Sequence, residues 1–134
     1  MATDDVMRRI FTESQTIAVV GASPSPHRAG HYIPAYLQEH GYRIIPVNPN
    51  HDEVLGEKCY DSLEDIPEPV DCVEVFRRPE YTPDVARQAV TIGARSLWLQ
   101  LGIVNDEAKR VAEEAGLMFV QDECMGPQHR RLVA

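Results

Sequence analysis

The residues best suited to chemistry in this chain of 134 residues gather in a short stretch near its start. Four apolar residues at 17–20 are followed at once by Gly21, Ala22 and Ser23, then by a loop with two prolines and a helical pattern. Glycine lets the backbone turn and approach a ligand closely, and the neighbouring amides, with the helix beyond them, can cradle a phosphate. The stretch predicts a phosphate-binding turn with Ser23 as an added hydroxyl donor; the alternative is that Gly21 simply ends a strand.

Cationic side chains that could hold phosphates lie at two places. Arg28, with His27 beside it, follows the turn and could reach a pyrophosphate. Arg77 and Arg78 come directly after an apolar run, in a chain whose formal net charge is -8. An arginine fork binds a phosphomonoester well. The alternative for this second pair is two solvated side chains, or ion pairs with the acidic residues that follow them.

Other strand ends carry weaker candidates. Phe76 could lie against a flat base, although core packing explains it equally well. Trp98 is expected in the core, and Gln100 or Leu101 just beyond it could contact a ligand.

Two marks of a dinucleotide site are missing. The fingerprint Gly-x-Gly-x-x-Gly would need glycines at the positions that hold Ser23 and Pro26. Asn48 stands where an acidic residue would hold a ribose at the end of the second strand. Both gaps argue against an NAD enzyme, and the proline-containing loop leaves room for a differently bent ligand.

No pattern of residues predicts a catalytic centre or a metal site. The sequence has no Walker-type phosphate loop, no His-Glu-x-x-His and no Gly-x-Ser-x-Gly elbow. Cys124 is a candidate reactive thiol, although a buried or bystander cysteine is the commoner case. His129, followed by two arginines, is either a distal ligand contact or, as we expect, part of a basic C-terminal tail. We therefore predict no catalytic residue and no metal ligand.

The elements that position these residues alternate along the chain. Apolar runs predict strands at 16–20, 42–47, 71–76, 96–99 and 117–120, with a short edge strand at 57–60. Helical spacing predicts helices at 3–11 and 30–40, and two more that follow the capping residues Thr82 and Asn105. Pro34 is awkward inside the second helix, so the regular helix is expected to begin close to it. No regular form is predicted for 125–133.

Strands that alternate with helices from 16 to 120, without a hairpin signal, indicate an α/β fold. We predict a Rossmann-like, doubly wound parallel sheet of about five strands flanked by helices. It forms a single domain over residues 1–134, with a core at about 14–122. Ligands bind beyond the carboxyl ends of such strands, where the strand order reverses, so segments 21–23, 47–49, 76–78 and 100–102 are expected to converge.

Composition narrows the class of partner and the location. A net charge of -8 argues against nucleic acid or an anionic membrane as partner. No apolar run is long enough for a membrane span, and the acidic start of the chain does not resemble a secretory signal. Three cysteines without zinc-site spacing fit a reducing compartment, so we expect a cytoplasmic protein.

Four ordered segments carry a resemblance to a known family. They are IAVVGASP at 17–24, HGYRIIPVNP at 40–49, VDCVEVFRRPE at 70–80 and IGARSLWLQLGI at 92–103. The chain resembles the small stand-alone CoA-binding proteins, which are similar to the CoA-binding domain of the succinyl-CoA synthetase α subunit. The resemblance covers roughly residues 6 to 132. The chain departs from the family pattern at Gly30 and His31, where Ser-Tyr is expected, and at Pro34.

The resemblance implies a Rossmann-like sheet that binds coenzyme A, and it implies the position of each contact. Against the pyrophosphate it places Gly21, Ala22, Ser23 and Arg28. Around the nucleotide it places Pro46, Val47, Asn48, Pro49, Phe76 and Arg77. Toward the pantetheine it places Gln100, Leu101 and Gly102. The 3′-phosphate of CoA would suit an arginine of the Arg77–Arg78 pair.

Three functions are consistent with the sequence. The first is a module that binds CoA or an acyl-CoA without catalysis of its own. The second is an enzyme in which the CoA thiol or thioester meets a protein group such as Cys124 or His129. The third and weakest is an NAD(P)-binding oxidoreductase. The synthetase domain with the phosphorylated histidine has no counterpart in this sequence, so ligase activity is not predicted.

Overall fold

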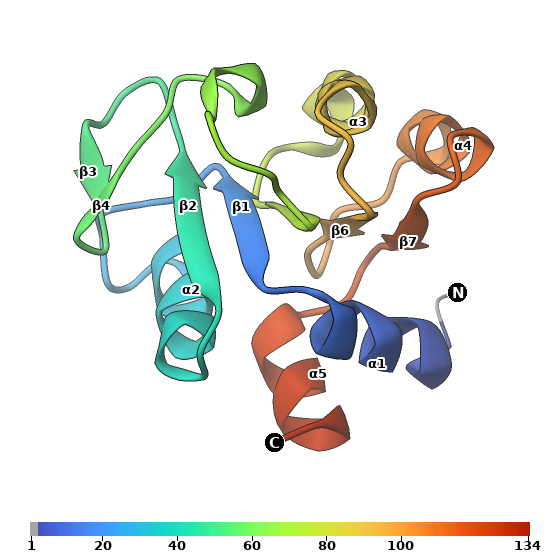
Figure 1. The fold of residues 1–134 in the computed structure, drawn as a ribbon, viewed down its shortest axis with the longest axis horizontal. Coiled ribbons are helices and arrows are strands. Elements are labelled where there is room, and N and C mark those ends of the chain that lie inside the picture. Colours follow the sequence, from blue (N-terminus) through green and yellow to red (C-terminus); the bar gives the residue numbers. More distant parts are fainter. Residues whose placement is uncertain (1–2) are drawn as a thin grey trace.

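A parallel β-sheet forms the centre of the computed structural model, which describes residues 3–134 (Figure 1). Within these residues the sheet has five strands in the order β2-β1-β5-β6-β7, and every neighbouring pair is parallel. The strands are β1 (Thr16–Val20), β2 (Arg43–Val47), β5 (Cys72–Val75), β6 (Ser96–Leu99) and β7 (Met118–Val120). The helices are α1 (Asp4–Glu13), α2 (Ala29–Glu39), α3 (Thr82–Thr91), α4 (Asp106–Glu114) and α5 (Met125–Leu132). The predicted Rossmann-like α/β fold is confirmed.

The helices cover both faces of the sheet (Figure 1). The apolar side chains of α3 and α4 pack on one face, and those of α1, α2 and α5 pack on the other. Alternate residues of β1 point to opposite faces, so Ala18 joins the first core and Val19 the second. This two-sided burial explains why the strands are apolar runs rather than alternating patterns.

The strand order reverses between β1 and β5. From β1 the chain passes through α2 to β2 on one side, and it returns to β5 on the other side of β1. The two helices that follow β1 and β5, α2 and α3, consequently lie on opposite faces (Figure 1). A crevice opens at such a reversal beyond the carboxyl ends of the strands.

A small hairpin lies beside β2, although the sequence shows no hairpin signal. β3 (Glu53–Val54) and β4 (Glu57–Lys58) pair antiparallel. The turn between them has positive φ at Leu55 (56°) and Gly56 (74°). Leucine rarely adopts this conformation, and for this reason the turn gave no signal in the sequence. The predicted edge strand at 57–60 shortens to β4, with a single bridge from Tyr60 to Val47.

One of the two predicted helix caps, Asn105, is confirmed, and Thr3 caps α1 as well. Thr3 Oγ1 accepts the Val6 amide at 3.2 Å, and the Asn105 side chain accepts the Ala108 amide at 2.8 Å. The cap at Thr82 is wrong. A 3₁₀ turn at Pro79–Tyr81 precedes α3, and the Thr82 hydroxyl donates to the Pro79 carbonyl at 2.7 Å. Thr82 is therefore the first helical residue and closes that turn.

Two further expectations about helices are wrong. The second helix begins at Ala29 and contains Pro34 in its interior, rather than beginning close to the proline. The tail forms α5, in which His129 is buried against a cluster of aromatic side chains rather than solvated. Within residues 3–134, no helix combines the length and apolar character that crossing a membrane requires.

Candidate functional site

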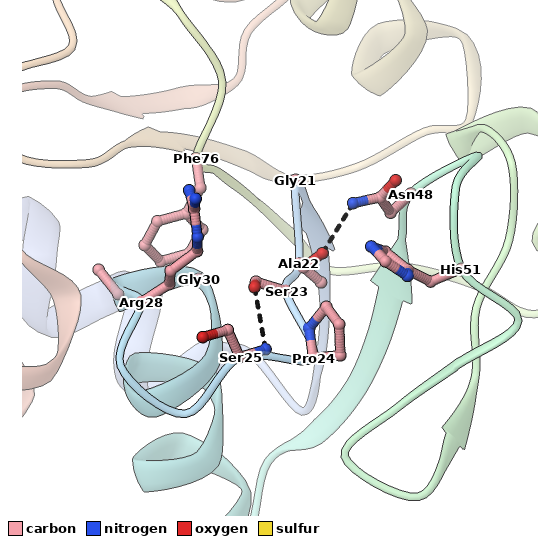
Figure 2. A pocket seen from close by; sticks show the side chains of 11 residues that line it. Gly21, Ala22, Ser23, Pro24, Ser25, Arg28, Gly30, Asn48, His51 and Phe76 are labelled. Atoms are coloured by element: carbon pink, nitrogen blue, oxygen red, sulfur yellow. Dashed lines mark hydrogen bonds between the residues drawn. The ribbon is translucent and has the colours of Figure 1, made fainter.

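A cavity of about 600 Å³ opens at the carboxyl end of β1, where the chain turns toward α2 (Figure 2). It is lined by Gly21, Ala22, Ser23, Pro24, Ser25, Arg28, Ala29, Gly30, Asn48, His51 and Phe76. The lining comes from three elements that follow β1, β2 and β5, which are the strands on either side of the order reversal. The cavity therefore depends on the strand order, which brings together segments that are distant in the sequence.

Two glycines bring the start of α2 against the end of β1. Gly21 has a φ of +87°, and a Cβ there would lie 2.7 Å from the Phe76 carbonyl oxygen. A Cβ on Gly30 would lie 2.8 Å from the Gly21 carbonyl oxygen. Any side chain at either position would force the backbone apart. Gly30 was missed as a site residue, although a glycine at the first turn of the helix after a nucleotide-type turn was a usable signal.

The N-terminus of α2 is open toward the cavity. Arg28 occupies the cap position without making a side-chain cap. Among the hydrogen bonds of residues 3–134, none involves the amides of Ala29 and Gly30, the first two helical residues. Unpartnered amides at the positive end of a helix attract an anion. Exposed Arg28 and half-buried His51 lie at the same cavity and supply further donors (Figure 2).

The loop before α2 is held by its own hydrogen bonds. The Ser23 amide donates to the Gly30 carbonyl at 3.1 Å, so it is not free to bind a ligand. The Ser23 hydroxyl oxygen accepts the Ser25 amide at 3.1 Å and keeps its own proton to donate (Figure 2). Asn48 Nδ2 donates to the Ala22 carbonyl at 2.9 Å, which ties the loop to the end of β2. An acidic residue at 48 could not make that bond.

A second hollow of about 250 Å³ adjoins the first. It is lined by Gly21, Val47, Asn48, Pro49, Asn50 and Arg77. The Arg77 guanidinium lies over the Tyr81 ring, with its carbon 4.6 Å from the ring centroid. Within the described chain Arg77 forms no ion pair, which leaves its charge free for a ligand. This hollow therefore combines apolar and amide side chains with one cation.

Five predicted positions do not line these two cavities. Arg78 is exposed, and Pro46 is buried within β2. Leu101 is 69% exposed, and the Gly102 amide donates to the Asp122 carboxylate at 2.7 Å. Gln100 points inward to Glu74. The convergence at the strand ends therefore has two parts: a cradle around β1, β2 and β5, and a separate rim after β6.

A buried polar link, which sequence reasoning missed, lies beneath this rim. Gln100 Nε2 donates to Glu74 Oε2 at 2.8 Å, and Gln100 Oε1 accepts the Met125 amide at 3.1 Å. Glu74 is fully buried, and burial raises its pKa to about 8. In the part of the chain described, Glu74 Oε1 has no hydrogen-bond partner. The link joins β5, β6 and the start of α5.

The groups considered for thiol chemistry are not arranged for it. Burial raises the pKa of the half-buried Cys124 thiol, which disfavours the reactive thiolate. His129 Nδ1 and the Tyr36 hydroxyl share a hydrogen bond of 2.9 Å in the aromatic cluster. Neither residue lines the cavity at β1. The described residues also contain no group of histidine, cysteine and acidic side chains that could hold a metal ion.

Fold and cavity together define an α/β protein with a cavity at the strand-order reversal of its parallel sheet. Residues 15–130 match the model of the CoA binding domain family, and the chain belongs to that family. It is 42% identical over 123 residues to uncharacterized protein YneT of Bacillus subtilis (strain 168), covering 92% of this chain and 91% of that one. A hypothetical protein from Pyrococcus horikoshii OT3 has a similar structure, with a TM-score of 0.95, 44% identity and coverage of 99% and 94% of the two chains.

Larger enzymes contain a related segment. Acetate–CoA ligase (ADP-forming) II of Archaeoglobus fulgidus is 32% identical over 101 residues. The match covers 74% of this chain and only 15% of the ligase. The chain thus corresponds to one part of such an enzyme.

Proposed function

We propose that this protein binds coenzyme A or an acyl-CoA in the cavity at the end of β1 and catalyses no reaction of its own. The observation that carries the proposal is the open N-terminus of α2 beside two close-packed glycines, in a chain of the CoA-binding family. A Cβ at either glycine would force apart the backbone segments that line the cavity. The donor set of amides, a hydroxyl and an arginine suits phosphate oxygens.

The pyrophosphate of CoA is assigned to the larger cavity. The amides of Ala29 and Gly30 would donate to its oxygens, with the Ser23 hydroxyl proton and the Arg28 guanidinium beside them. None of these donors is acidic, although the protein has a net charge of -8. The negative charge of the pyrophosphate would therefore meet neutral or positive groups in the cavity.

The adenosine part is assigned to the adjoining hollow. Asn48 and Pro49 would border the ribose, and Arg77 would face the 3′-phosphate. A guanidinium already stacked on an aromatic ring is held in place, which lowers the ordering cost of binding a phosphate. Arg78 is exposed and is assigned a smaller share of this contact.

The pantetheine would leave the cradle past Phe76 toward the rim at Gln100–Gly102. Exposed Leu101 gives this rim an apolar surface, whereas the Gly102 amide is already bonded to Asp122. The thiol or acyl end would therefore reach the surface of the molecule rather than a closed pocket. This position suits presentation of a thioester more than its hydrolysis.

Isothermal titration calorimetry with CoA and with NAD tests the assignment. CoA is expected to bind and NAD to bind far more weakly. The variant Arg28→Ala is expected to lose about tenfold in CoA affinity, since it removes a charged hydrogen-bond donor. Arg110→Ala, which removes an exposed arginine of α4, is the matched control and should leave the affinity unchanged. Tighter binding of NAD than of CoA would contradict the proposal.

The absence of catalysis has its own test. Acetyl-CoA incubated with the protein should release no free CoA above the blank, and CoA disulfide should leave no adduct on the protein in mass spectrometry. An adduct lost in Cys124→Ser but not in Cys59→Ser would instead establish thiol exchange. Three free cysteines fit the proposed cytoplasmic location, which fractionation of cells would check.

A further inference from the structure

The proline inside α2 changes where a backbone hydrogen bond goes. Pro34 lacks an N–H, so the carbonyl of Gly30, four residues earlier, cannot receive its helical hydrogen bond. That carbonyl accepts the Ser23 amide instead, at 3.1 Å. The proline therefore leaves a helical acceptor available to the loop that precedes the helix.

His31, the residue after Gly30, forms a hydrogen bond with the backbone carbonyl of the same serine. His31 Nδ1 lies 2.8 Å from the Ser23 carbonyl oxygen. A carbonyl only accepts, so Nδ1 carries the proton and donates it. The amide and the carbonyl of Ser23 are thus both bonded to the first turn of α2.

We propose that Pro34 and His31 are positioning residues that fix Ser23 and so hold the loop in its phosphate-binding form. The proposal rests on the CoA-binding function proposed above. With Ser23 fixed, Ser23, Ala29 and Gly30 line one cavity before the ligand arrives, and the amides of Ala29 and Gly30 have no partner among the described residues. A loop that is already ordered loses less entropy when the ligand binds.

The variant Pro34→Ala tests the proposal through affinity, stability and amide exchange. Alanine restores an N–H that competes for the Gly30 carbonyl. CoA affinity is expected to fall about three- to tenfold, the value of one hydrogen bond. The Ser23 amide is expected to exchange faster with solvent. The urea midpoint of unfolding is expected to stay or rise, because the helix regains a bond.

The variant His31→Ala is expected to weaken CoA binding in the same range, and His31→Asn to restore much of it, since the Asn Nδ2 can donate to the Ser23 carbonyl. Pro83→Ala is the matched control, because Pro83 lies in the first turn of α3, where a proline breaks no helical bond. Its CoA affinity should equal that of the wild type.

Unchanged CoA affinity in Pro34→Ala would overturn the proposal, as would unchanged exchange of the Ser23 amide. A parallel loss of affinity and urea midpoint, with no recovery in His31→Asn, would assign the residues a merely structural role and overturn it too. A wild-type protein that does not bind CoA but protects the Ser23 amide would instead refute the proposed function and leave the loop contacts standing.

Discussion

At Gly30 the obstacle to a side chain is steric alone, because its backbone is helical, whereas Gly21 also has a positive φ. Its backbone faces the Gly21 carbonyl so closely that a Cβ would come within 2.8 Å of that oxygen. The oxygen belongs to a backbone that is itself held against Phe76, so it cannot move aside cheaply. A change of one methyl group at Gly30 therefore reports on the cradle more directly than the removal of a charged side chain.

Gly30→Ala is expected to weaken CoA binding more than tenfold and to destabilise the fold by about 1 to 3 kcal/mol, as overpacking does. Calorimetry and urea unfolding measure the two effects. Gly93→Ala is the control, because Gly93 has a φ of +76° with open space around it. It should lose about 1 kcal/mol through backbone strain alone and bind CoA normally. Equal affinities of the two variants would rule out close approach at Gly30.

The assignment of Arg77 to the 3′-phosphate of CoA can be tested with dephospho-CoA, which lacks this phosphate. If Arg77 faces the 3′-phosphate, Arg77→Ala should weaken CoA about tenfold and dephospho-CoA far less. Titration of both ligands into the wild type and the variant gives the coupling free energy between the Arg77 side chain and the 3′-phosphate. Arg78→Ala, at an exposed position, should show a smaller coupling. An equal loss for the two ligands would place the 3′-phosphate elsewhere.

At the scale of elements, sequence patterns were most informative where the physical cause was local. The strands at Thr16–Val20 and Ser96–Leu99 were predicted with their observed bounds, since both are continuous apolar runs buried on two faces. The hairpin was missed because Leu55 adopts a positive φ, which its residue type disfavours. Helix α5 was missed because tertiary contacts of His129 hold a segment with few apolar residues.

The candidate site divides in the same way. The turn at 21–23 and the positions of Asn48 and Arg77 follow from strand ends that a sequence displays. Gly30 and His51 line the cavity because of the way α2 and the loop after β2 pack against β1. The residue type at either position does not predict this packing. The Gly30 carbonyl contact also needed the helix to continue through Pro34, against the usual expectation for proline.

The link between β5, β6 and α5 predicts a pH dependence of stability. The pKa of Glu74 is raised by burial from 4.5 to about 8, so the folded state binds more protons than the unfolded state between these values. Stability is therefore expected to fall as pH rises from about 4.5 to about 8, by up to a few kcal/mol. Urea unfolding of Glu74→Gln, which keeps an oxygen for Gln100, should show a flatter profile. Identical slopes in the two proteins would contradict this account.

At the scale of the whole molecule, an acidic protein presents a small basic and amide-lined cradle beyond the carboxyl ends of β1, β2 and β5. Arg28, Arg77 and the start of α2 lie at this cradle, whereas the net charge is -8. The field of the molecule as a whole therefore disfavours polyanions such as nucleic acids, and in the proposed function local donors would hold a single phosphorylated ligand. The related ligase contains a similar segment within a much longer chain.

The most direct test is an NMR titration of the protein with CoA that follows each backbone amide. If CoA binds in the cavity at β1, the largest shifts are expected at Ala22, Ala29 and Gly30, with smaller shifts at Asn48 and Arg77. Amides around the separate hollow between α1 and α4, such as Phe119, should not move. The claim that CoA binds at the end of β1 would be contradicted if saturating CoA left the chemical shifts of the first three amides unchanged. Shifts confined to the α1–α4 side would contradict it too.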